Sequence, residues 1–380
     1  MRILRLILDN WRNFKRVEMP LGRRAFICGP NASGKSNLLD AIRFLRDISK
    51  SGGGLQPALQ QRGGVSKVRC LAATRYSDVA LNVQLGEVQE FPEWEYTLVF
   101  SQDKQRRPIV KGEVVMHDGK VIMCRPNEND KKDPELLTQT HLEQVTTNKE
   151  FRAVVDFLSS IKYMHVVPQL IREPDRSVGK KDDPFGGDFL EQLAKTKPKF
   201  LDSRLAKINK ALKIVVPNLD RIEIERDEKG TPHLKGLFKH WRPNAGWQGE
   251  DQFSDGTLRL LGLLWSLFQG EGPLLLEEPE LSLHNAVVRH IPQMLARLSR
   301  KLKRQLIIST HSYEMLTDSG IAPEEAVILI PTESGTKVEI AANNLTILDT
   351  ISCGESLAEA VFQVTAPAHA HQLPLFVDER

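Results

Sequence analysis

Residues 29–36 read Gly-Pro-Asn-Ala-Ser-Gly-Lys-Ser and match the pattern G-x-x-x-x-G-K-[ST] in full. Glycine permits backbone conformations that a Cβ would block, so that successive N–H groups can face a phosphate. Lys35 can reach the β- and γ-phosphates of a nucleotide, and the Ser36 hydroxyl can bind Mg²⁺. The alternative is an ordinary glycine-rich turn between a strand and a helix. The residues predicted to surround the phosphates are Gly29, Asn31, Ala32, Ser33, Gly34, Lys35, Ser36 and Asn37.

Two adjacent carboxylates end the apolar run Pro273-Leu-Leu-Leu. A buried strand beside the strand of the phosphate loop would deliver Glu277 toward a metal ion and Glu278 toward an attacking water. Hydrolysis of a nucleoside triphosphate needs one group that holds Mg²⁺ and another that polarises water. Solvated acids at the end of a strand are the alternative.

Two further sites have residue types suited to a phosphate. Ser254 precedes an apolar helix and is a good N-cap, and with Gly256 it makes the helix start an anion site. Because residues 29–36 already hold the phosphates of their own chain, we expect this second site to meet a nucleotide on another subunit. His311 follows the apolar run Leu306-Ile-Ile-Ser-Thr, at the sheet edge where ligands collect, and can hydrogen-bond the γ-phosphate or the water.

The surrounding sequence predicts the elements that position these groups. Residues 2–8 are predicted to form an edge strand, 24–28 a short buried strand, and the segment from Asn37 an amphipathic helix. Residues 51–64 are predicted to be a glycine-rich loop, 68–124 antiparallel strands, and 126–149 a mobile polar connection. From residue 253 the pattern alternates helix and strand, and the last forty residues lose clear periodicity.

The amino-acid composition limits the class of protein to which the chain can belong. The chain has 380 residues, 41% hydrophobic and 27% charged, with a net charge of +3. This is a globular balance that excludes a disordered or fibrous chain and permits, without requiring, contact with nucleic acid. Four dispersed cysteines argue against a disulfide framework or a zinc site and fit a reducing cytoplasm. The sequence contains no signal peptide or membrane span, so we expect a cytoplasmic protein that does not contact a membrane.

Taken in order, these motifs resemble the ABC-type ATPase heads of the SMC, RecF and OLD group. The phosphate loop at 29–36, a signature at 253–257, a Walker B strand at 274–278, a D-loop-like segment at 282–284 and a switch histidine at 311 carry the resemblance. It implies an α/β fold, namely a P-loop ATPase head with a β-rich N-terminal lobe and a mixed strand and helix insertion. It also implies ATP and Mg²⁺ as ligands, slow ATP hydrolysis, and a homodimer with two ATPs between the subunits.

The resemblance assigns roles to individual residues. Glu278 would be the hydrolytic base, and Ser254 and Gly256 would touch the nucleotide of the other subunit. Gln169 resembles the glutamine that senses Mg²⁺ and the γ-phosphate, although Gln84 is an alternative. Arg12 is expected to approach the nucleotide.

Three positions depart from the family pattern. Ala32 replaces a frequent glycine, Glu277 replaces the usual aspartate, and Asp255 adds a negative charge near a bound phosphate. The implied organisation is a first part of the head at 1–67, an insertion at 68–250, a second part of the head at 251–340 and a tail at 341–380.

The sequence narrows the family further. It has no sustained heptad insert, and no DxD pair of a Toprim nuclease follows His311. The chain therefore resembles small bacterial AAA-family ATPases that regulate a separately encoded effector in phage defence or in toxin–antitoxin-like pairs. The alternative is a RecF-like ATPase of DNA repair, for which the basic runs 195–199 and 300–304 are candidate contacts.

Overall fold

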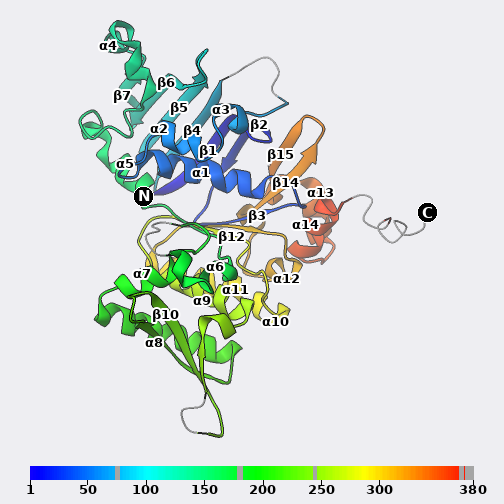
Figure 1. Ribbon diagram of the computed structural model, residues 1–380. Helices are drawn as coiled ribbons and strands as arrows, with labels where there is room; N and C mark the ends of the chain where they lie inside the picture. Colours follow the sequence, from blue (N-terminus) through cyan, green and yellow to red (C-terminus); the bar gives the residue numbers. More distant parts are fainter. Residues whose placement is uncertain (73–77, 178–182, 243–245, 368–371, 373–380) are drawn as a thin grey trace, which may run out of the picture. The chain divides into compact units, whose positions relative to one another are not determined.

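The computed structural model describes residues 1–72, 78–177, 183–242, 246–367 and 372. It divides the chain into two compact units (Figure 1). The first contains residues 1–162, 271–275 and 295–380, and the second contains residues 163–270 and 276–294. Residues 68–162, predicted as part of the insertion, thus share a unit with the phosphate loop. The elements with residues of both units are β8 (Lys162–Met164), β12 (Leu274–Glu277) and α11 (Ile291–Leu302).

An antiparallel sheet of order β2-β1-β4-β5-β6-β7 forms the first layer of the first unit. Its strands are β1 (Arg2–Trp11), β2 (Phe14–Pro20), β4 (Val79–Gly86), β5 (Trp94–Gln102), β6 (Pro108–His117) and β7 (Lys120–Arg125). Every second residue of β4 and β5 is buried, which confirms the strands predicted from alternation. The prediction that residues 2–8 form an edge strand is wrong, because β1 pairs with β2 on one side and β4 on the other.

The second sheet carries the phosphate loop. Its order is β15-β14-β3-β13-β12-β8, and β3 (Arg24–Cys28) pairs in parallel with both β13 (Leu306–Thr310) and β14 (Ala326–Thr332). The hairpin partner of β14 is β15 (Gly335–Ile340). Strand β3 is apolar over most of its length because it is buried within the sheet.

Helix α1 (Lys35–Ser49) packs against both sheets of this unit. Phe44 packs between Trp11 of β1 and Phe100 of β5 in tilted ring contacts, with ring centroids 5.2 and 5.6 Å away. Leu38, Leu39, Ile42, Leu45 and Ile48 are fully buried, so the helical spacing seen in the sequence is confirmed. The phosphate loop is therefore fixed by a central strand before it and a buried helix after it.

Two segments predicted as loops carry helices in the structure. Within residues 51–64, Leu55 and Leu59 are buried on the short helix α2 (Leu55–Gln60). The connection predicted as mobile, 126–149, contains α4 (Glu128–Lys132) and a 3₁₀ turn at Pro134–Thr138. The tail contains α13 (Leu345–Ser352) and α14 (Leu357–Thr365). The remaining helices and turns of this unit are α3 (Val65–Val68), α5 (Arg152–Ser160), α12 (Tyr313–Leu316), Lys149–Phe151, Pro323–Glu325 and Ala341–Asn343.

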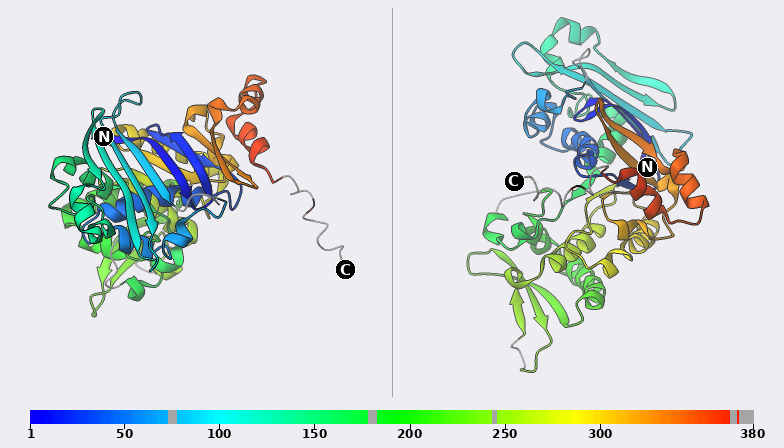
Figure 2. Two further views of the ribbon diagram at one scale, coloured as in Figure 1. Left: turned by 90° about the horizontal axis from the view of Figure 1, so that it is seen from above. Right: turned by 90° about the vertical axis from the view of Figure 1, so that its right-hand side faces the viewer.

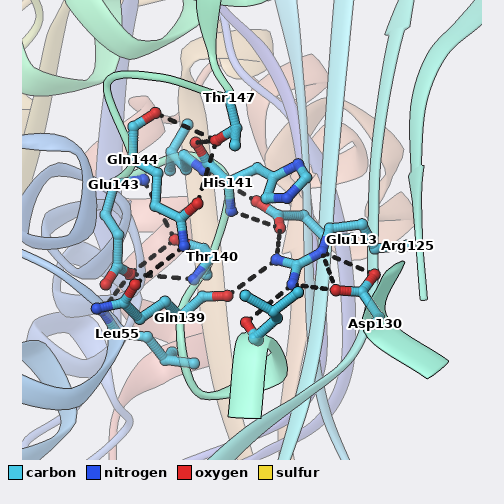
Figure 3. Close-up of polar contacts among 12 residues, drawn as sticks. Leu55, Glu113, Arg125, Asp130, Gln139, Thr140, His141, Glu143, Gln144 and Thr147 are labelled. Carbon is cyan, nitrogen blue, oxygen red and sulfur yellow. Dashed lines mark hydrogen bonds and ion pairs between the residues drawn. The ribbon is translucent and has the colours of Figure 1, made fainter. Parts of the chain in front are cut away.

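A buried polar network fixes the connection 126–149 to the antiparallel sheet (Figure 3). Arg125 pairs with Glu113 at 3.2 Å and with Asp130 at 2.6 Å, and all three side chains are at most 1% exposed. Glu113 also accepts the backbone N–H groups of His141 and Leu142. Local sequence gave no sign of this network because no motif marks the pairing of Arg125 with Asp130, five residues away, or with Glu113, twelve residues away.

The second unit consists of helices around a small antiparallel sheet of order β11-β10-β9. Helix α8 packs along β9 in this unit, and the sheet is visible in green in the right-hand view of Figure 2. The elements are α6 (Pro168–Ile171), α7 (Phe189–Lys195), α8 (Pro198–Val215), β9 (Leu219–Arg226), β10 (Pro232–Phe238), β11 (Trp247–Gly249), α9 (Asp255–Leu267), α10 (Asn285–Val288) and 3₁₀ turns at Pro174–Ser177 and Glu250–Gln252. Among the described residues, no helix combines the length and apolar character needed to cross a bilayer.

Candidate functional site

The phosphate loop follows β3 and has the backbone conformations that a phosphate cradle requires. Gly34 has φ of 100°, and a Cβ there would meet the Asn13 side chain at 2.2 Å. A Cβ on Gly29 would lie 2.8 Å from the Leu329 carbonyl oxygen. Ala32 has φ of 63°, in the left-handed region that a glycine adopts at less cost. The departure at Ala32 is thus accommodated in a strained conformation.

Two side chains that the sequence analysis did not single out hold this loop in place. Asn13 donates to the Ser33 carbonyl at 2.8 Å, and Thr336 of β15 donates to the same oxygen at 2.8 Å. Asn13 also accepts from Asn37 at 2.8 Å. The neighbouring Arg12, predicted to approach the nucleotide, contacts Asp40 at 3.3 Å and the Lys67 carbonyl at 3.2 Å. No motif marks Asn13 or Thr336, since both act through the backbone of the loop.

Some of the predicted phosphate-binding side chains of the loop are buried, and others are exposed to solvent. The Lys35 ammonium donates to the carbonyls of Gly29 and Pro30 at 2.9 and 3.1 Å and is buried. Asn31 and Ser36 are exposed. The Ser33 hydroxyl is buried without a hydrogen-bond partner among the described residues. The loop therefore offers a buried cation and a buried, unsatisfied hydroxyl.

His311 lies close to this loop within the first unit. It follows β13, the strand parallel to β3, and is exposed. A cavity of about 670 Å³ is lined by Cys28–Asn31, by Thr310 and His311, by 329–331 and by the end of α14. The structure thus brings the predicted switch histidine and the start of the phosphate loop to one cavity.

Glu277, the predicted metal ligand, and Glu278, the predicted base, both belong to the second unit. Glu277 accepts a hydrogen bond from the Tyr163 hydroxyl, and His165 Nδ1 lies 3.3 Å from the Glu277 carbonyl oxygen. Glu278 has φ of 44°, a strained conformation of the kind that collects at functional sites. Burial lowers the pKa of Arg259, although the charges of Asp255, Glu278 and Glu280 act to raise it. A guanidinium therefore lies in the field of the predicted hydrolytic base.

The signature turn is capped as predicted and packs against the D-loop-like segment. The Ser254 hydroxyl accepts the Thr257 N–H at 3.2 Å, which confirms its N-cap role at the start of α9. A Cβ on Gly256 would lie 2.6 Å from the Ser282 carbonyl oxygen, so only glycine fits there. Asp255 pairs with Arg172 at 2.6 Å, which supplies the physical account that the sequence lacked for this acid.

The two candidate sensing glutamines differ in their surroundings. Gln169 is exposed on the short helix α6 of the second unit, in the same turn as Arg172. Gln84 lies on β4 in the first unit and donates to Glu95 of the next strand at 3.3 Å. Gln84 thus belongs to a cross-strand pair of the antiparallel sheet, and Gln169 is the better candidate.

Comparison with known proteins places the chain in a family. Residues 24–317 match the family described as "AAA domain, putative AbiEii toxin, Type IV TA system". The chain belongs to this AAA-domain family. A search of curated proteins finds no match to it.

Solved structures agree with this AAA-domain assignment at the level of the fold. The Smc head bound to the C-winged helix domain of ScpA is 16% identical with a TM-score of 0.54, over 89% of this chain and 97% of that one. An Smc head with an extended coiled coil, bound to the C-terminal domain of ScpA derived from Pyrococcus furiosus, is 14% identical with a TM-score of 0.50, over 92% and 99%. The predicted fold class, an α/β P-loop ATPase head of the ABC and SMC type, is confirmed.

The residues of this AAA-domain chain fit ATP and Mg²⁺, the usual ligands of such ATPases. The loop combines the Gly34 cradle, the Lys35 ammonium and the unsatisfied Ser33 hydroxyl, all suited to phosphate oxygens. The Ser36 hydroxyl of the same loop is an oxygen group of the kind that Mg²⁺ prefers together with substrate phosphates. The donor chemistry therefore matches a magnesium nucleotide.

Proposed function

We propose that this chain is an ATPase head that dimerises around two ATPs and regulates a separately encoded effector. The observation that carries the proposal is the phosphate loop at the end of β3, with left-handed Ala32 and Gly34 and an inward-facing Lys35. A loop of this shape at a helix N-terminus binds nucleotide phosphates through backbone N–H groups and a cation.

The hydrolytic step follows from the groups present. A water oxygen attacks the γ-phosphorus, the bond to the β–γ bridging oxygen breaks, and ADP leaves with that oxygen. Glu278 accepts the proton of the water, and His311 donates a hydrogen bond to the γ-phosphate. Lys35 neutralises charge on the β- and γ-phosphates. Ser36, Glu277 and Gln169 are the residues that would hold Mg²⁺, which would polarise the phosphate oxygens. Tyr163 orients the Glu277 carboxylate through its hydrogen bond.

The dimer follows from the signature turn. The first turn of α9 presents backbone N–H groups beside Ser254 and Gly256, and a helix start of this kind attracts a phosphate. We propose that it contacts the nucleotide held by the partner's phosphate loop. Hydrolysis would then require two copies of the chain.

The effector role is supported by the family description, which names a Type IV toxin–antitoxin system. The proposed partner is a protein whose activity depends on the ATP-bound dimer, in a toxin–antitoxin-like pair or in phage defence. The second candidate, a RecF-like DNA-binding ATPase, is favoured by exposed lysines at 195–199 and on α8, Lys207 and Lys210. Phosphate contacts of this kind weaken steeply with salt.

The proposed hydrolysis is tested with Glu278→Gln. This variant keeps the size of the side chain but cannot accept a proton, so we expect ATP binding, turnover reduced by a factor of about 100 or more, and an ATP-bound dimer. Light scattering with and without ATP measures the mass. Turnover at the rate of the unmodified protein would show that Glu278 is not the base.

The proposed sharing of the site is tested with Ser254→Arg. The long side chain would block the helix start in the second unit, whereas the phosphate loop belongs to the first unit, so we expect ATP binding without dimerisation. Unchanged hydrolysis would mean that the site is not shared.

A salt-titrated duplex-binding assay separates the two candidate functions. The absence of duplex binding at low salt, with or without ATP, argues against the repair ATPase. Co-purification of the neighbouring gene product supports regulation of an effector.

A further inference from the structure

Arg172 follows the turn that carries Gln169, and its side chain bonds to the residues on either side of Ser254. Arg172 lies three residues after Gln169, and its N–H donates to the Pro168 carbonyl at 3.1 Å, which continues the turn of α6. Residues three apart on a helical turn lie on the same face. A displacement of the backbone at Gln169 therefore displaces Arg172 as well.

The Arg172 guanidinium holds the signature turn on both sides of Ser254. Nη2 donates to the Phe253 carbonyl at 2.7 Å and lies 2.6 Å from Asp255 Oδ1. Both contacts are partly shielded, since the side chain of Arg172 is 23% exposed and that of Asp255 38%. Arginine suits this position because its fork presents several N–H groups in a fixed plane.

The other side of the turn is fixed to β10. The Phe253 ring packs against Phe238 at 5.8 Å, and a Cβ on Gly236 would lie 2.6 Å from that ring. Just upstream, buried Glu250 accepts the Leu234 N–H and contacts His233. The signature turn is thus held on one side by β10, and on the other side Arg172 connects it to α6, the helical turn that carries Gln169.

This link also explains Asp255. A carboxylate beside a phosphate site would repel the nucleotide, and pairing with Arg172 offsets that charge. Loss of Arg172 would therefore loosen the turn and leave an unbalanced negative charge at the helix start.

We propose that Arg172 is a positioning residue that couples Gln169 to the signature turn, so that nucleotide bound at Gln169 sets how Ser254 and Gly256 meet the partner's nucleotide. The inference deepens the proposed function and rests on it. It concerns the presentation of the turn and leaves ATP binding by the phosphate loop of the same chain unchanged.

The test uses Arg172→Gln and Arg172→Lys in the Glu278→Gln background, with Arg176→Gln as the matched control. Arg176 is 71% exposed and pairs only with Glu173 among the described residues. Sedimentation measures the dissociation constant of the ATP-bound dimer, and calorimetry at low protein concentration measures ATP binding to the monomer. We expect Arg172→Gln to weaken the dimer about tenfold, or about 1.4 kcal/mol, with ATP binding within twofold. Arg172→Lys should weaken it less, and Arg176→Gln should have no effect.

A second pair of measurements separates coupling from damage to the fold. Asp255→Asn breaks the same ion pair, so hydrogen exchange of the amides at 253–258 should quicken, and adding Asp255→Asn to Arg172→Gln should change that exchange by less than the sum of the single changes. Should Arg172→Gln fail to fold, Asp255→Asn carries the test alone. Hydrogen exchange of the amides at 253–258 in the monomer should quicken in Arg172→Gln and slow on ATP binding only when Arg172 is present.

The results distinguish failure of the positioning role of Arg172 from failure of the proposed ATP-bound dimer. A Glu278→Gln protein that stays monomeric with ATP overturns the proposed dimer, and the exchange at 253–258 then decides the role of Arg172. Dimerisation of Arg172→Gln at the strength of its background, or an equal loss in ATP binding, overturns the positioning role.

Discussion

The buried network at Arg125 offers the sharpest test of how the first unit is stabilised (Figure 3). Arg125 and Arg107 both pair with two carboxylates, but Arg125 is fully buried and Arg107 is 41% exposed. Replacing Arg125 by Met leaves Glu113 and Asp130 buried without their cation, and the carbonyls of Leu136 and Gln139 lose a donor. We expect the free energy of unfolding to fall by about 3–5 kcal/mol for Arg125→Met and by much less for Arg107→Met.

The assay must report on the first unit alone, since two units need not unfold together. Native-state hydrogen exchange of β6, which pairs with the strand of Arg125, and of β5 beyond it gives the free energy of opening for each variant. Adding Glu113→Gln to Arg125→Met should recover part of the loss, because it removes one uncompensated charge. Equal losses for the Arg125 and Arg107 variants would refute the reasoning, since burial would then make no difference.

Two other changes test local conformation and protonation. Ala32→Gly removes the strain of a left-handed alanine, about 1–2 kcal/mol, and loses about 0.5–1 kcal/mol to the greater backbone entropy of glycine in the unfolded chain. The melting temperature should therefore rise slightly with Ala32→Gly and fall with Ala153→Gly on helix α5. A lower melting temperature for Ala32→Gly would contradict this. Burial and the charge of Arg125 lower the pKa of His141 to about 4 from 6.5. Only the unfolded chain gains this proton as the pH falls from about 6.5 to 4, so stability should decrease over that range. After allowance for solvent screening, His141→Gln should remove about 1–2 kcal/mol of that decrease in denaturant titrations, and an unchanged slope would exclude His141 as its source.

Sequence patterns predicted the parts whose physics is local. The strand, loop and helix from Arg24 to Ser49 were predictable because an apolar run, two glycines and a helical period lie next to one another. The N-cap at Ser254 was equally visible, since the cap depends on residues within one turn. Alternation likewise predicted β4 and β5.

Contacts between distant residues were beyond the sequence. Asn13 and Thr336 meet at the Ser33 carbonyl from positions more than three hundred residues apart. The ion network that orders 126–149 joins β6 to a segment whose composition is that of a loop. The partner of Asp255 was invisible for the same reason, because Arg172 lies far upstream.

The cavity beside the phosphate loop has a consequence for selective chemical inhibition. Its floor is the start of that loop and His311, which lie within the family-matched residues 24–317. One of its walls is the end of α14, with Val361, Phe362 and Thr365, outside that matched region. The cavity has a volume of about 670 Å³. A compound bound there would contact the start of the phosphate loop and His311, which lie in the family-matched region. Its selectivity would come from the side chains of α14, which lie outside that region.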